Sequence, residues 1–253
     1  MKTRFAIFLS ALILLLAACA PAATPPPTAI PTSTPTLTPT ITPTATPNAT
    51  ATQAAKATQQ MEQAVTKVKS ELEALDISTD TGELAYYDPT AVLVPLTGHY
   101  QYLAVPINEG KSLTAADFVL STDITWHSPG LSTCGIVFRS EPNLKSGAQY
   151  LLELLRLSGL PAWSISYMED AKFQNSPSGS RTSSAIDQSD GGKNHVVLVA
   201  REGKFTLYIN EVRQGNYYDY SEQRLDGHFG FYAWQDTGST TCTFENTAIW
   251  IYK

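Results

Sequence analysis

Acidic side chains are the residues of this sequence best suited to acid–base chemistry. Glu153 stands alone in the apolar run YLLELLRL, and Glu169 and Asp170 are adjacent, so that in a strand they would point to opposite faces. Cleavage of a glycosidic bond with retention requires two carboxylates about 5 Å apart, and no strand-spaced pair of that kind occurs. We therefore expect Glu153 to pair with a base such as Arg139 or Arg156, and we predict no catalytic residue.

Histidine and cysteine spacing predicts no metal site. The four histidines are isolated, and no His-x-x-x-His or Cys-x-x-Cys grouping occurs. Four aspartates in expected loops offer the oxygen ligands that calcium prefers; they are Asp187, Asp190, Asp219 and Asp226. Solvated turn aspartates are the commoner case, so we expect no cofactor and leave calcium open. The sequence also lacks Gly-x-Ser-x-Gly, phosphate-loop and dinucleotide motifs.

Aromatic side chains are the remaining candidates for a binding surface. Sugar rings stack on aromatic faces, while the polar ends of Trp and Tyr stay hydrated. Most aromatic residues in strands are core residues, whereas three tyrosines in the expected loop at 217–220 are harder to bury. That loop is the leading candidate. The full set of candidate ligand-binding residues is Tyr217, Tyr218, Tyr220, Trp126, Trp163, Trp234, Arg139 and Glu153.

Short β-strands must position these residues. Between about 83 and 253, runs rich in β-branched and aromatic residues alternate with Gly, Pro, Asn and Asp turns, which is typical of an antiparallel sandwich. The runs are 118–126, 134–139, 150–157, 163–167, 195–200, 205–210, 227–234 and 244–252. Glu202-Gly203 fits a tight hairpin, which would place Leu207 and Ile209 on the core face. The segment 84–108 stays open, because its prolines suit edge strands.

The N-terminal region resembles the signal and lipobox of bacterial lipoproteins. Lys2 and Arg4 precede an apolar run of about 14 residues, too short for the roughly 20 residues that span a bilayer. The run ends in Leu-Ala-Ala-Cys19, and the cysteine of that motif is acylated in the family. The resemblance implies a signal peptide at 1–18 and a lipid anchor on Cys19 at the outer face of the membrane. An ordinary signal peptide is the alternative.

Assignment of Cys19 to lipid leaves Cys134 and Cys242 as an even pair in an oxidising compartment. A disulfide between them is the economical prediction. In the chain-entropy model it would stabilise the fold by roughly 4–5 kcal/mol. Two buried free thiols are the alternative.

Charge excludes one class of partner. The chain has 17 basic and 23 acidic residues, a net charge of −6, and removal of Lys2 and Arg4 with the signal peptide would make it −8. Because no basic cluster occurs, we expect no nucleic-acid partner.

A linker and a helix separate the anchor from the strands. Residues 19–50 are dominated by Thr, Pro and Ala, with a proline at every fourth position from 27 to 47. Such a chain favours extended polyproline II, and at about 3.1 Å per residue it would reach on the order of 80 Å. The segment 51–82 predicts one helix with an apolar stripe that comprises Met61, Val65, Val68, Leu72 and Leu75. We expect this stripe to pack on the domain or fray, with dimerisation as the alternative.

The strand pattern resembles the concanavalin A-like jelly roll of laminin G-type modules, legume lectins and some glycosidases. The similarity lies in NHVVLVA at 194–200, GKFTLYIN at 203–210 and GHFG at 227–230. Its nearest subset is the 3-keto-disaccharide hydrolase-like domain. Glu211 replaces the usual hairpin glycine, so we expect a wider turn there. The resemblance implies an all-β jelly-roll sandwich at 83–253 and carbohydrate as the ligand class.

Three functions remain open, because a fold does not decide a function. The first is a lipid-anchored, non-catalytic cell-surface module, expected to be a monomer, that binds carbohydrate or another extracellular ligand. The second is a glycoside-acting hydrolase of the 3-keto-disaccharide hydrolase-like kind, with a site assembled from distant strands. The third is a structural or adhesion spacer.

Overall fold

The computed structural model describes residues 49–108, 112–157, 159–221 and 223–253. The expected signal peptide, Cys19 and most of the Thr/Pro linker lie outside them. No helix of the described residues is long and apolar enough to cross a membrane. The elements are α1 (Ala49–Ala74), β1 (Glu83–Asp88), β2 (Val92–Thr97), β3 (Gln101–Pro106), β4 (Phe118–His127), β5 (Ser132–Ser140), β6 (Gln149–Leu157), β7 (Leu160–Glu169), β8 (Lys172–Asn175), β9 (Arg181–Thr182), β10 (Lys193–Arg201), β11 (Lys204–Ile209), β12 (Val212–Tyr218), β13 (His228–Gln235) and β14 (Ser239–Ile251).

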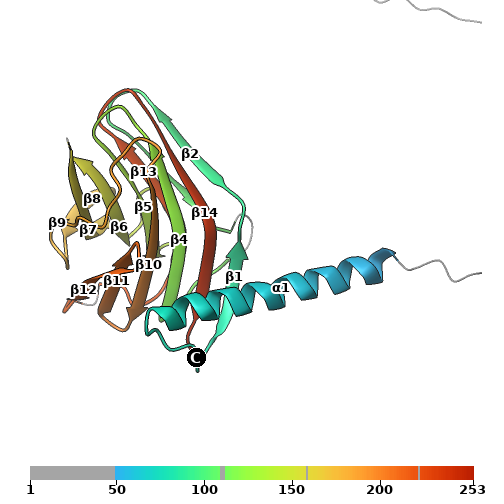
Figure 1. Ribbon diagram of the computed structural model, residues 1–253. Helices are drawn as coiled ribbons and strands as arrows, with labels where there is room; N and C mark the ends of the chain where they lie inside the picture. Colours follow the sequence, from blue (N-terminus) through green and yellow to red (C-terminus); the bar gives the residue numbers. More distant parts are fainter. Residues whose placement is uncertain (1–48, 109–111, 158, 222) are drawn as a thin grey trace, which may run out of the picture. The chain divides into compact units, whose positions relative to one another are not determined.

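Two antiparallel sheets face each other and confirm the expected jelly-roll sandwich (Figure 1). Sheet A has the order β1-β14-β4-β10-β11-β12, with β2 also paired to β14. Sheet B has the order β3-β13-β5-β6-β7-β8, with β9 also paired to β7. Strands distant in sequence are neighbours in both sheets, so each face is assembled from separate parts of the chain.

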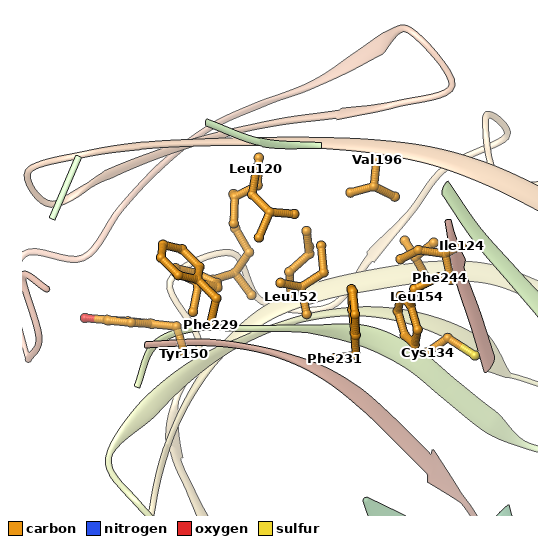
Figure 2. Close-up of a cluster of buried hydrophobic side chains, with 14 of the residues drawn as sticks. Leu120, Ile124, Cys134, Tyr150, Leu152, Leu154, Val196, Phe229, Phe231 and Phe244 are labelled. Carbon is orange, nitrogen blue, oxygen red and sulfur yellow. The ribbon is translucent and has the colours of Figure 1, made fainter. Parts of the chain in front are cut away.

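The core lies between the sheets and follows the two-residue period of the strands. In Figure 2, Leu120, Ile124 and Phe244 of sheet A lie opposite Leu152 and Phe231 of sheet B. All five side chains are buried. The expected core positions Leu207 and Ile209 on β11 are fully buried as well.

A disulfide joins the two sheets across this core. Cys134 of β5 in sheet B is bonded to Cys242 of β14 in sheet A, at a sequence separation of 108. The predicted pairing is confirmed. Closure of a loop of this length reduces the entropy of the unfolded chain, which is how such a bridge stabilises a fold.

Helix α1 covers part of the outer face of sheet A. Val68 and Leu72 are buried against Val119, Val197 and Trp250. The second half of the apolar stripe therefore packs on the domain. Met61, nearer the start of the helix, remains half exposed at 50%.

Two local expectations need correction, and the open segment is resolved. Ile209 pairs directly with Val212, so Asn210 and Glu211 form a tight two-residue turn with φ values of 48° and 66°, not the wider turn expected. Tyr217 and Tyr218 end strand β12 instead of lying in a loop. The segment 84–108 contributes β1, β2 and β3, each at a sheet edge or paired only to β14.

Candidate functional site

Three of the candidate residues are buried in the interior. Trp126, Trp163 and Arg139 are each at most 1% exposed, so they leave no surface for a ligand. Regular alternation of side chains along β5 would place Arg139 beside Val137 on the outer face of sheet B. A bulge in the β5–β13 pairing, with Arg139 at a φ of 47°, turns its side chain inward to carbonyl groups of Ala116 and Glu202.

The outer face of sheet B brings two of the remaining candidates, Glu153 and Trp234, onto one surface. Cross-strand pairing sets Tyr232 opposite Gly135, Gly135 opposite Glu153, and Glu153 opposite Ser164. The next row sets Tyr102 opposite Trp234. We call the group Tyr102, Tyr232, Trp234, Glu153, Ser164 and Ser166 the sheet B face.

Glu153 is the polar centre of the sheet B face. Its Oε2 accepts hydrogen bonds from the hydroxyls of Ser164 and Ser166, each at 3.1 Å. Within the described residues, Oε1 has no hydrogen-bond partner. The expected pairing with Arg139 or Arg156 is therefore wrong, because strand β7 supplies hydroxyl groups opposite Glu153 in the register.

Burial makes the charge of this carboxylate costly. It raises the pKa of Glu153 above its ordinary value, although the two serine hydroxyls act in the opposite direction. The pKa of Tyr232 is also raised, first by burial and then by the charge of Glu153. The Glu153 carboxylate and the Tyr232 hydroxyl therefore interact electrostatically across strand β5.

Aromatic rings line one side of the sheet B face. Tyr102 is 38% exposed, and Trp234 and Tyr232 are partly buried on the neighbouring strand. Between Tyr232 and Glu153 lies Gly135, where a Cβ would collide with the backbone carbonyl of Leu152. A side chain does not fit there, because the backbones of β5 and β6 approach closely between the ring and the carboxylate.

Apolar side chains border the sheet B face at the end nearest Ser166. Leu144, from the loop after β5, packs over Val137 and Leu151 and closes one end. Beyond Ser166 along β7, Met168 is paired with Phe173 of β8, which is 62% exposed. The face thus has a polar centre, aromatic rings on one side and apolar side chains at one end.

The tyrosines of the leading sequence candidate lie elsewhere. Tyr217 turns inward, and its ring packs edge-on against Trp163 with centroids 5.2 Å apart. Tyr218 and Tyr220 are exposed and stack on each other, with centroids 5.8 Å apart. The structure therefore separates the candidates into a buried set, the sheet B face and a tyrosine pair.

Metal ligands do not converge in the part of the chain that the structure describes: no group of three or more His, Cys, Asp or Glu residues has suitable geometry. Asp187 and Asp190 accept backbone hydrogen bonds from Ser189 and Ser128. Asp219 is held by Tyr150 and Ser221. These three aspartate carboxylates thus accept hydrogen bonds within the protein. Calcium binding stays open.

Sequence reasoning missed Tyr102, Tyr232, Ser164 and Ser166. The two serines alternate with Trp163 and Ile165, so a two-residue period marks them as facing away from the core. The period does not say that they lie beside Glu153. That juxtaposition depends on the β6–β7 register.

Comparison with known proteins finds similar folds but no relative by sequence. No family model and no curated protein matches the chain. A carbohydrate-binding module, CBM66, from Bacillus subtilis is 17% identical, with a TM-score of 0.43, over 61% of this chain and 92% of that one. A legume lectin-like domain from Entamoeba histolytica is 12% identical, with a TM-score of 0.46, over 68% and 89%. A protein of unknown function with a galectin-like fold from Bacillus subtilis is 12% identical, with a TM-score of 0.45, over 69% and 99%. These similarities assign no ligand or activity to this chain.

Proposed function

We propose that the sandwich is a non-catalytic binding module for carbohydrate, and that the sugar lies on the sheet B face. The observation that carries this proposal is the unpartnered Oε1 of Glu153 on the same sheet face as the rings of Tyr102, Tyr232 and Trp234. A sugar offers hydroxyl donors at its edges and C–H groups on its ring faces. The sheet B face offers an acceptor and aromatic surfaces in the same places.

The spacing suits a single sugar ring. Tyr232 and Glu153 are separated by the strand that carries Gly135, which is two strand spacings or about 10 Å between backbones. A sugar ring that rests over the Gly135 backbone would contact the tyrosine on one side. Its hydroxyls reach the carboxylate on the other side, where a hydrogen bond to an ionised acceptor is stronger than a neutral one.

The partners of Glu153 favour binding over hydrolysis. Retaining cleavage needs a second carboxylate about 5 Å away, whereas the residues bonded to Glu153 are serines. The alternative is a hydrolase that uses Glu153 as a proton donor, which its raised pKa would suit. Turnover assays on any bound glycan separate the two proposals, because the binding module releases the sugar unchanged.

The proposed location is the outer face of a bacterial membrane, through lipid on Cys19. The short apolar run before Leu-Ala-Ala-Cys19 and the Thr/Pro linker after it support this proposal. The linker would hold the sandwich clear of the membrane. Metabolic labelling with an alkyne-tagged palmitate tests the anchor. Label should enter the wild-type chain and be absent from Cys19→Ser, and equal labelling of both would refute it.

A glycan array tests the binding proposal. The soluble form should begin at Ala20, directly after the expected lipid site. It then retains α1, which covers apolar residues of sheet A. We expect binding to one group of glycans that Glu153→Gln and Trp234→Ala each weaken by at least about fivefold, since each removes roughly 1 kcal/mol or more. Tyr100→Ala is the matched control, since Tyr100 is 74% exposed and lies outside the face.

Two results would contradict the proposal. One is an array in which the wild-type chain binds no glycan, which would favour the spacer alternative. The other is glycan binding that Glu153→Gln and Trp234→Ala leave unchanged although thermal melting shows both variants folded.

A further inference from the structure

A second surface with aromatic rings lies at the turn between β10 and β11, away from the sheet B face. It is a pocket of about 530 Å³ lined mainly by Asp117, Arg201, Glu202, Lys204, Tyr218 and Tyr220. We call it the tyrosine pocket. The proposed function does not use it.

The two tyrosines of the pocket are exposed to an unusual degree. Tyr218 is 46% and Tyr220 is 89% exposed, and their rings stack within 19° of parallel. The intervening Asp219 points the opposite way and is buried. A stacked pair of rings that is exposed to solvent offers its outer face to a ring-shaped ligand, and rings that remain exposed contribute little to folding.

The wall that carries the tyrosines is firmly held. The Asp219 carboxylate accepts a hydrogen bond from the buried Tyr150 hydroxyl and one from the Ser221 backbone N–H at 3.0 Å. The backbone N–H of Asp219 donates to the carbonyl of Gly203 at 2.8 Å. Burial acts to raise the pKa of Asp219, but the hydrogen bonds from Ser221 and Tyr150 outweigh it and hold the pKa below its ordinary value.

The buried guanidinium of Arg139 ties together the segments around the pocket. It donates to the carbonyl of Glu202 at 2.6 Å and to that of Ala116 at 2.7 Å. Arg224, from the segment after the tyrosines, donates in turn to the carbonyl of Arg139 at 2.7 Å. A site fixed in this way loses little conformational entropy when it binds a ligand.

Charges of both signs surround the rings. Lys204 and Arg201 are balanced by Asp117 and Glu202. Among the described residues, the Lys204 ammonium and the Glu202 carboxylate have no hydrogen-bond or ion-pair partner. A sugar hydroxyl both donates and accepts hydrogen bonds, so a neutral saccharide can use both groups, whereas a charged ligand would meet repulsion from one of them.

We propose that the tyrosine pocket is a second saccharide site, in which a neutral sugar residue packs on the outer face of the stacked pair Tyr218 and Tyr220 and its hydroxyls bind Lys204 and Glu202. The domain would then hold a polysaccharide at two places. Two linked weak sites retain a repetitive polymer far better than either one alone. This inference stands whether or not the sheet B face binds sugar.

The test is calorimetric titration of the soluble chain with neutral tetrasaccharides of glucose, mannose, galactose and xylose, together with retention on the matching immobilised polysaccharides. The variant is Tyr218→Ala/Tyr220→Ala, and Tyr100→Ala is the control. We expect the double variant to lose one of two binding sites per chain. Retention on the polymer should fall by about tenfold or more with an unchanged melting temperature.

A parallel variant, Glu153→Gln/Trp234→Ala, separates this inference from the proposed function. Loss of a site in both double variants supports both surfaces, and loss only in the tyrosine variant supports the pocket against the sheet B face. The pocket is refuted if the tyrosine variant keeps the stoichiometry and retention of the wild type. It is also refuted if none of the four tetrasaccharides binds the wild-type chain.

Discussion

His195 fastens helix α1 to the sandwich, and its removal should loosen that contact in a pH-dependent way. Its Nδ1 lies 2.7 Å from Oδ1 of Asp123 on β4, and its Nε2 lies 3.2 Å from Oε1 of Glu71 on α1. Lys193 also reaches Asp123, at 2.8 Å. Replacement by glutamine removes the positive charge between the two carboxylates and keeps a polar side chain.

The magnitude follows from the pKa of the imidazole. Burial alone would lower the pKa of His195, but the hydrogen bonds and charges of Asp123 and Glu71 outweigh it and raise the pKa to about 9. Its ordinary value is near 6.5, so the charged form would stabilise the fold by about 3–4 kcal/mol at roughly 1.4 kcal/mol per pKa unit. The side chain is 27% exposed, and solvent screening brings this nearer to about 2 kcal/mol.

The sign of the pH dependence is fixed by the same shift. Because the folded pKa is raised, the stabilisation is fully present below pH 6.5 and is lost as pH rises through about 9. Urea unfolding at pH 6 should show His195→Gln less stable than the wild type by about 2 kcal/mol. At pH 9.5 the difference should shrink to well under half. His99→Gln is the control, since His99 is exposed. A difference that stays constant from pH 6 to 9.5 would refute the reasoning.

Further predictions concern packing and backbone geometry. Cys134→Ser/Cys242→Ser should lower the free energy of unfolding by about 4 kcal/mol, measured with urea; a loss below about 1 kcal/mol would contradict the loop-closure argument. Glu211→Gly should raise the melting temperature, because Glu211 has a φ of 66° and glycine relieves about 1 kcal/mol of strain; a lowered melting temperature would refute it. Leu72→Ala, which empties a buried position under α1, should cost about 2–5 kcal/mol in the same urea assay, and a cost below about 1 kcal/mol would show that α1 is not packed.

Much of the fold was predictable, because it depends on local pattern. Alternation of apolar and polar residues is enough to predict β11 with Leu207 and Ile209 inward. Once Cys19 is assigned to lipid, the even number of remaining cysteines is enough to predict the bridge from Cys134 to Cys242. Both follow from the chain itself, without knowledge of which strands are neighbours.

The candidate site was predictable only in fragments. Glu153 and Trp234 were identified as separate candidates, but their common surface depends on the order β13-β5-β6-β7 in sheet B. Arg139 was misplaced because a one-residue bulge reverses the direction of a side chain. Tyr217 was misplaced because β12 extends to Tyr218. Two consecutive tyrosines show no alternation of apolar and polar residues, so the sequence gives no sign that the strand continues there.

The tight turn at Asn210-Glu211 illustrates a further limit. Glutamate at a positive φ is disfavoured, so the sequence argued for a wider turn. The structure compensates through the Asn210 side chain. It donates to the carbonyl of Ala185 at 2.7 Å and accepts from the backbone N–H of His195 at 2.7 Å. Such tertiary hydrogen bonds are invisible to a local reading of the chain.

Tryptophan fluorescence tests most directly the central claim that sugar binds the sheet B face. Trp126, Trp163 and Trp250 are at most 2% exposed, whereas Trp234 is partly buried on the face itself. Titration of the soluble chain with the glycan selected by the array should give a saturable change in emission that Trp234→Phe abolishes. An emission change of the same size in Trp234→Phe, or glycan binding with no change in the wild type, would contradict the claim.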